Sequence, residues 1–189
     1  SSVGLIITKK TNASGHWTTF HISKGNGGYG SLNANDQFGT GAQWGVTNTT
    51  FNADGGLANN ATGDTYVAYL FADNTGEDAE DQMIKCGSYT GAGANLNINL
   101  GWEPQFVMIK CTSHTTNWVM FDTMRGLPVD GNAKDLKPNL SDSEGDNSAI
   151  GITSTGFLAR NGVDGQINAN GRSYIYMVIR APMMKEPEA

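Results

Sequence analysis

Hydrophobic residues along the chain come in short runs that are separated by turns rich in Gly, Asn, Asp and Ser. Short apolar runs between such turns are typical of β-strands, whereas helices need longer segments with a period of about 3.6 residues. The pattern therefore predicts strands over residues 3–10, 17–23, 44–51, 65–72, 83–89, 94–100, 105–111, 118–124 and 173–181.

Three segments carry more detailed signals. In 94–100, three apolar residues alternate with asparagines, so we expect one buried and one exposed face, because successive strand residues point to opposite sides. In 65–72, TYVAYLFA, the apolar run is unbroken, which indicates a strand buried on both faces. Residues 25–30, GNGGYG, are expected to form a loop, since glycine adopts positive φ angles freely.

The pattern of the first strand pair occurs twice in the chain. Residues 5–25, LIITKKTNASGHWTTFHISKG, match residues 106–126 at an offset of 101 positions, which aligns Trp17 with Trp118. The offset then grows to 106 and 108 through insertions in turns. These later matches are Asn33 with Asn139, Phe51 with Phe157, Tyr66 with Tyr174 and Leu70 with Val178. A repeat of this length predicts two related structural units.

An acidic segment, DNTGEDAED over 73–81, marks a change of composition between the two copies. We therefore predict an all-β fold, a β-sandwich or jelly roll, with two sequence-related halves in tandem. The first β module covers residues 1–78 and the second covers 79–189. Segment 83–100 has no counterpart in the first half. Either the first module lacks its N-terminal strand, or both halves share one larger sandwich; we favour two packed modules.

Composition narrows the classes of function. The net charge is −6 and the pI is near 4.9, which argues against nucleic-acid binding, because that needs clustered Lys and Arg. No apolar run reaches the length of about 18 residues that suggests a transmembrane helix, so we expect no membrane insertion. No signal peptide is visible, and the chain starts almost directly with a strand. We therefore expect a processed chain or a part of a longer one.

Titratable residues show no catalytic or metal-binding pattern. His16, His21 and His114 lack the spacing of a metal site and are expected at the surface or at strand edges. Acidic clusters at 73–81 and 142–146 could hold Ca²⁺, but they lack the spacing of a calcium loop, and we interpret them as solvated. Cys86 and Cys111 could pair if their strands are neighbours; we favour two buried free thiols. We expect no catalytic residue, no metal and no cofactor.

Candidate ligand-binding residues lie around the glycine-rich segment. Tyr29 is the best candidate for an exposed binding aromatic, with Asn26 beside it and Asn33 in the next turn. The alternative is that Tyr29 packs on its own module. Trp17, Trp118 and Trp44 are expected in the core, and Trp102 fits either role.

Several blocks of the chain resemble a repeat family of tailed-bacteriophage proteins that is common in marine and cyanobacterial phages. These blocks are TYVAYLFADN, CGSYTGAGANLNINLGWEPQFVMIK, NWVMFDTMRG, GITSTGF and GRSYIYMVIRAPM. The resemblance covers nearly the whole chain and implies a non-enzymatic virion component, such as a tail-fibre protein. It does not itself imply a ligand or a catalytic residue, because the family has no established site motif to carry over.

From the residues and the resemblance together, we expect a virion structural protein that acts through interfaces. Its partners would be copies of itself, with a trimer favoured, and other virion proteins. The alternative is a receptor-binding module for host-surface glycans. A glycan depolymerase is a third hypothesis and would need two carboxylates facing each other across a groove.

Overall fold

The first sheet of the protein has five antiparallel strands in the order β4-β3-β2-β1-β7. The computed structural model describes residues 2–41, 44–53, 59–74, 82–160 and 165–181. The strands of the first sheet are β1 (Ser2–Lys10), β2 (Trp17–His21), β3 (Gly28–Ser31), β4 (Gly39–Thr40) and β7 (Tyr66–Asp73). A single 3-10 turn, η1 (Ile22–Lys24), follows β2. Within the described residues no α-helix occurs, and none of the helical structure could span a membrane.

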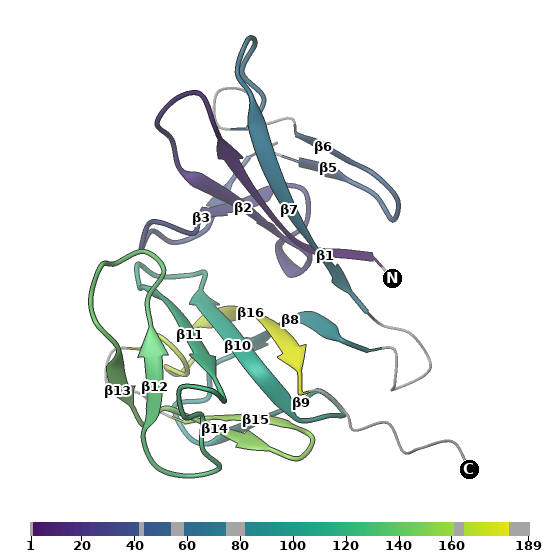
Figure 1. Cartoon of the computed structure of the whole chain (residues 1–189). Coiled ribbons are helices and arrows are strands. Elements are labelled where there is room, and N and C mark those ends of the chain that lie inside the picture. The colour runs from purple at the N-terminus through teal and green to yellow at the C-terminus, as the bar shows by residue number, and fades with distance from the viewer. Residues whose placement is uncertain (1, 42–43, 54–58, 75–81, 161–164, 182–189) are drawn as a thin grey trace.

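The second sheet has six strands in the order β13-β12-β11-β10-β16-β8 and lies below the first in Figure 1. Its strands are β8 (Ile84–Thr90), β10 (Pro104–Cys111), β11 (Trp118–Asp122), β12 (Ala133–Leu136), β13 (Gly145–Asn147) and β16 (Ser173–Arg180). A third sheet pairs β14 (Ile150–Thr153), β15 (Gly156–Ala159) and β9 (Leu96–Asn99). A hairpin joins β5 (Trp44–Val46) to β6 (Phe51–Ala53). The fold is therefore all-β with antiparallel sheets.

Three hydrophobic cores connect these sheets. Leu5 and Ile7 of β1 share one core with Met108 of β10 and Trp118 of β11, between the first and second sheets. A second core lies between the six-stranded and three-stranded sheets, and a third lies between the first sheet and the β5–β6 hairpin. Alternate residues of β1 and β10 enter different cores, which explains why the apolar runs of these strands are unbroken.

Most predicted strands are confirmed, and the errors fall in glycine-rich and turn-rich segments. Residues 28–30 of the expected glycine loop belong to β3, and only Gly25 there has a positive φ, of 63°. The strand predicted over 44–51 is instead the β5–β6 hairpin, in which Thr47 and Thr50 hydrogen-bond across the turn. The asparagines of β9 are exposed and Leu100 is buried, as the alternation predicted.

Both cysteines are buried free thiols, as predicted. Cys86 and Cys111 lie on β8 and β10, which flank β16 on opposite sides, and their side chains enter different cores. Burial and the charge of Asp73 raise the pKa of the Cys86 thiol. We therefore expect both thiols to react slowly with a thiol-specific reagent in the native protein, because both side chains are buried and the reactive thiolate of Cys86 is suppressed. Titration in urea should reveal two thiols per chain; fast labelling without urea would contradict the burial.

Candidate functional site

The strand β7 forms one edge of the first sheet and carries exposed apolar side chains. It bonds to β1 on one side, and no described strand pairs with its other side. Tyr69 is 48% exposed and Leu70 is 50% exposed. The prediction that this segment is buried on both faces was therefore wrong. A long apolar edge with unpaired backbone groups is a template for pairing with another strand.

The strand β16 shows what β7 would look like with a partner. It pairs with β10 as β7 pairs with β1, so that Val178 lies opposite Val107, and Leu70 lies opposite Ile6. However, β16 also pairs with β8 along its other edge. Val178 is consequently 0% exposed, whereas Leu70 is half exposed. The two strands have the same apolar character, so their different burial comes from their neighbours.

An aromatic pair extends the apolar surface of β7. The ring of Tyr69 stacks on Trp17 of β2, with centroids 6.2 Å apart and an interplanar angle of 28°. Trp17 is half-buried, so the expectation that it is a core residue holds only in part. Trp44, Trp102 and Trp118 are all buried. We call Trp17, Tyr69 and Leu70 the β7 apolar surface. Tyr69 lies opposite Ile7 and Leu70 lies opposite Ile6, so the aromatic pair and Leu70 lie on opposite faces of the sheet at this edge.

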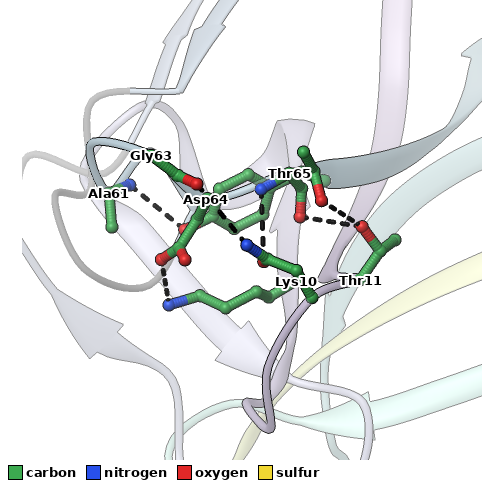
Figure 2. A network of polar contacts seen from close by, with 8 residues as sticks. Lys10, Thr11, Ala61, Gly63, Asp64 and Thr65 are labelled. Carbon is green, nitrogen blue, oxygen red and sulfur yellow. Dashed lines mark hydrogen bonds and ion pairs between the residues drawn. The ribbon is translucent and has the colours of Figure 1, made fainter.

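A network of polar contacts fixes the beginning of β7 against the end of β1 (Figure 2). Lys10 and Asp64 form an ion pair of 2.5 Å, and the hydroxyl groups of Thr11 and Thr65 lie 2.7 Å apart. The hydrogen bond with Asp64 raises the pKa of Lys10, and the same contact lowers the pKa of Asp64. The amide N–H of Ala61 donates to the Tyr66 hydroxyl. The network holds β7 in place and leaves its outer edge open.

The corresponding end of β16 uses similar contacts. The Thr112 N–H donates to the Ser173 carbonyl oxygen at 2.8 Å, as the Thr11 N–H does to Thr65 at 2.9 Å. The Ala169 N–H donates to the Tyr174 hydroxyl at 2.9 Å. The Lys10–Asp64 ion pair has no equivalent there, because Cys111 stands at the position that corresponds to Lys10.

The structure gives each predicted ligand-binding residue a contact within the protein. The side chain of Asn26 accepts a hydrogen bond from the Val46 N–H at 3.0 Å. The side chain of Asn33 accepts one from the Trp17 N–H at 2.9 Å. The ring of Tyr29 covers Gly39 on the paired strand, since a Cβ there would lie 2.6 Å from the ring.

Only one of these three residues lines a described pocket. Asn26 borders a pocket of about 270 Å³ together with Phe20, Val46 and Asn48. Tyr29 and Asn33 do not line it. The structure therefore does not bring the three candidates together around this pocket.

A second pocket, of about 330 Å³, lies where the first two sheets meet. Its lining is rich in hydroxyl groups, including Ser88, Thr90, Thr112 and Ser173, and its charged group is Lys24. No carboxylate and no histidine line it. It therefore lacks the pair of carboxyl groups that a typical glycoside hydrolase uses.

Buried titratable groups lie at the junction between the first two sheets. The prediction that all three histidines lie at the surface was wrong for His21, which is buried and bonds the Tyr176 carbonyl oxygen at 2.9 Å. Burial lowers the pKa of Lys110 to about 8, and its ammonium group donates to the carbonyl oxygens of Asn35 and Thr116. These groups bond backbone atoms, which indicates a structural role.

Acidic residues are mostly paired where they are described. Asp122 and Glu144 both contact Arg125, and Asp146 contacts Lys134, in exposed ion pairs. Asp73 is buried and accepts a hydrogen bond from the Cys86 N–H at 2.9 Å, so its assignment to a solvated linker was wrong. Residues 77–81 of the acidic segment, and the predicted boundary at 78, lie outside the described residues. Among the residues that are described, no cluster suits a metal ion.

Comparison with known proteins identifies a family by sequence. A family model described as a domain of unknown function (DUF7483) matches residues 1–182. No curated protein and no solved structure matches the chain.

Proposed function

The chain belongs to the DUF7483 family, and we propose that it is a non-enzymatic structural protein of a tailed-phage virion. It would form part of a tail fibre, a tail appendage or the head decoration and act through protein–protein interfaces. The observation that carries this proposal is the apolar, half-exposed edge strand β7. The resemblance of the sequence blocks to tailed-phage proteins supplies the virion context.

We further infer that the fold is a β-sandwich of two sequence-related halves. The pairing of β1 with β2 supports this, because Lys9 lies opposite Trp17 just as Lys110 lies opposite Trp118. Every pair in these two ladders is related by the same offset of 101 positions. The ladders of β1 with β7 and of β10 with β16 also share an irregularity at the same place, between Val3 and Leu5 and between Pro104 and Phe106.

Hydrogen bonds outside the ladders support the same inference. Asn33 accepts from the Trp17 N–H, and Asn139 accepts from the Trp118 N–H at 3.1 Å. These four residues are the pairs that align in the sequence repeat. A shared side-chain bond at aligned positions is expected if both halves descend from one structural unit.

The β7 apolar surface suits an interface for two reasons. Burying a Leu side chain that is otherwise exposed contributes roughly 1.5–3 kcal/mol, and aromatic side chains are enriched at interface centres. The open edge also offers backbone N–H and C=O groups to a partner strand. The partners would be copies of this chain, in a symmetric assembly for which a trimer is favoured, and other virion proteins.

Substitution of Leu70 tests the proposed function. We expect the purified protein to form trimers or larger assemblies at high concentration, and Leu70→Lys to weaken this association about tenfold or more, because it places a charge in the interface. Light scattering across a concentration series measures both. Met124→Lys is the matched control, since Met124 is 95% exposed and lies in the turn that follows β11 rather than on β7. A monomer at all concentrations would reject self-assembly. An equal loss of association in both variants would exclude β7 as the interface.

Recognition of host-surface glycans receives less support. The side-chain oxygens of Asn26 and Asn33 already accept backbone hydrogen bonds, and the Tyr29 ring is packed on Gly39. A sugar would have to compete with these contacts for the same groups. We therefore rank the glycan-binding hypothesis second, and a depolymerase below it.

A further inference from the structure

In the second half of the chain, two strands close the open edges of two different sheets. The strand β8 pairs with β16 from Ile84 opposite Ile179 to Thr90 opposite Ser173. The strand β9, which follows β8 in the chain, pairs with β15, with Ile98 opposite Phe157. Together, β8 and β9 form a segment that we call the closing unit, defined as residues 84–99.

The first half has the strands that this unit would bind. The pairing of β5 with β6 matches that of β14 with β15, since Trp44 lies opposite Ala53 and Ile150 lies opposite Ala159. Both matches follow the sequence offset of 106 positions. Among the described strands, β6 pairs only with β5, and β7 pairs only with β1. No described strand therefore lies beside these two edges, whereas the matching edges of the second half are closed.

Side-chain burial follows this difference. Phe157 is buried in the core between the six-stranded and three-stranded sheets. Val178 belongs to the same core, and Ile98 packs against it. Its counterpart Phe51 is only partly buried, and Leu70, the counterpart of Val178, is half exposed. In the second half, β9 places Ile98 opposite Phe157. A closing unit beside β6 and β7 would cover Phe51 and Leu70 in the same way.

We propose that the edges of β6 and β7 bind a closing unit, with the chemistry of residues 84–99, from a neighbouring module of the same family. Its first strand would extend the first sheet beside β7, and its second strand would extend the β5–β6 hairpin. This names the partner of the β7 apolar surface and so rests on the proposed function. The second half identifies the occupant, because there a strand pair of this kind fills the matching position.

The binding chemistry is that of strand addition. Backbone hydrogen bonds along β7 supply affinity, and side chains at alternate positions supply specificity. In the second half, Gly87 of the unit lies under the ring of Tyr176, where a Cβ would be 2.3 Å from the hydroxyl oxygen. The first half has Ala68 at the position of Tyr176. A unit that binds β7 is therefore free to carry a larger residue than glycine there.

A fusion protein tests the proposal directly. Residues 82–101, with Cys86→Ser in the added copy, are joined to Ser1 of the full chain. Since Val3 aligns with Pro104, this junction keeps the natural spacing between the unit and the next strand. We expect amide hydrogen exchange of residues 51–53 and 66–73 to slow about tenfold or more. We also expect the midpoint of thermal unfolding to rise by about 4 °C or more.

A second fusion carries Ile84→Asp and Ile98→Asp in the added copy. It should show neither slower amide exchange nor a higher midpoint of thermal unfolding. Unchanged exchange in the first fusion, or equal protection in both, would overturn the proposal. The proposed function is judged separately by the association of the unfused chain. If that chain assembles through Leu70 but the fusion shows no protection, the occupant is wrong and the structural role stands. If neither occurs, both are rejected.

Discussion

Replacing Trp118 with alanine is expected to lower the free energy of unfolding by about 3–5 kcal/mol. The indole is 1% exposed and lies in the core between the first two sheets, beside Phe38 at 6.1 Å between ring centroids. Its N–H donates to the Ser31 carbonyl oxygen at 2.9 Å, which links β11 to β3. The substitution leaves both a cavity and an unpaired buried carbonyl group, and each is costly. Urea unfolding followed by circular dichroism measures the loss.

The sequence repeat provides a matched control for this prediction. Trp17→Ala changes the aligned residue, but Trp17 is half-buried and stacks on the exposed Tyr69, so we expect a loss of only about 1–2 kcal/mol. Trp118→Phe keeps much of the volume and should lose about 1–3 kcal/mol through the missing hydrogen bond. Equal losses for Trp17→Ala and Trp118→Ala would mean that the deeper burial of Trp118 and its hydrogen bond do not set its contribution to stability.

Local pattern predicted the strands well, because alternation and turn residues act over a few positions. The asparagines of β9 and the paired strands of 5–25 and 106–126 are examples. Burial was harder to predict where it depends on distant segments. The apolar pattern of β7 resembles that of β16, yet only β16 has a strand on each side. No property of residues 65–72 themselves carries that information.

The candidate site was predicted less well for a related reason. Asn26 and Asn33 were selected as exposed amides near an aromatic residue, but asparagine side chains commonly bond backbone groups in turns, and both do so here. The β7 apolar surface was missed because its exposure depends on whether a second strand pairs with β7, and no described strand does so. The signal in the sequence was segment 83–100, which has no counterpart in the first half.

His21 was also misplaced by sequence reasoning, because its burial depends on β16, which lies 155 residues further along the chain. The Ser23 N–H donates to its Nδ1 at 3.2 Å, so Nδ1 is unprotonated, and Nε2–H donates to the Tyr176 carbonyl oxygen. Both nitrogens of the neutral ring are therefore satisfied. A second proton on Nδ1 would face the Ser23 N–H at a buried position. The neutral ring therefore satisfies both contacts, whereas the charged ring loses the hydrogen bond from the Ser23 N–H.

Acid is accordingly expected to destabilise the protein through His21. Burial lowers its pKa to about 4, whereas an unfolded chain has a histidine pKa of about 6.5. Between these two values the unfolded state binds more protons, so the free energy of unfolding falls as the pH decreases through this window. The loss from this residue approaches about 3 kcal/mol near pH 4. Urea unfolding at pH values from 7 to 4 measures it.

His21→Gln should flatten this part of the pH dependence, whereas His16→Gln, at an exposed position, should preserve it. If His21→Gln keeps the full dependence, the acid sensitivity arises from other groups, and the pKa of His21 is not lowered by burial in the folded protein.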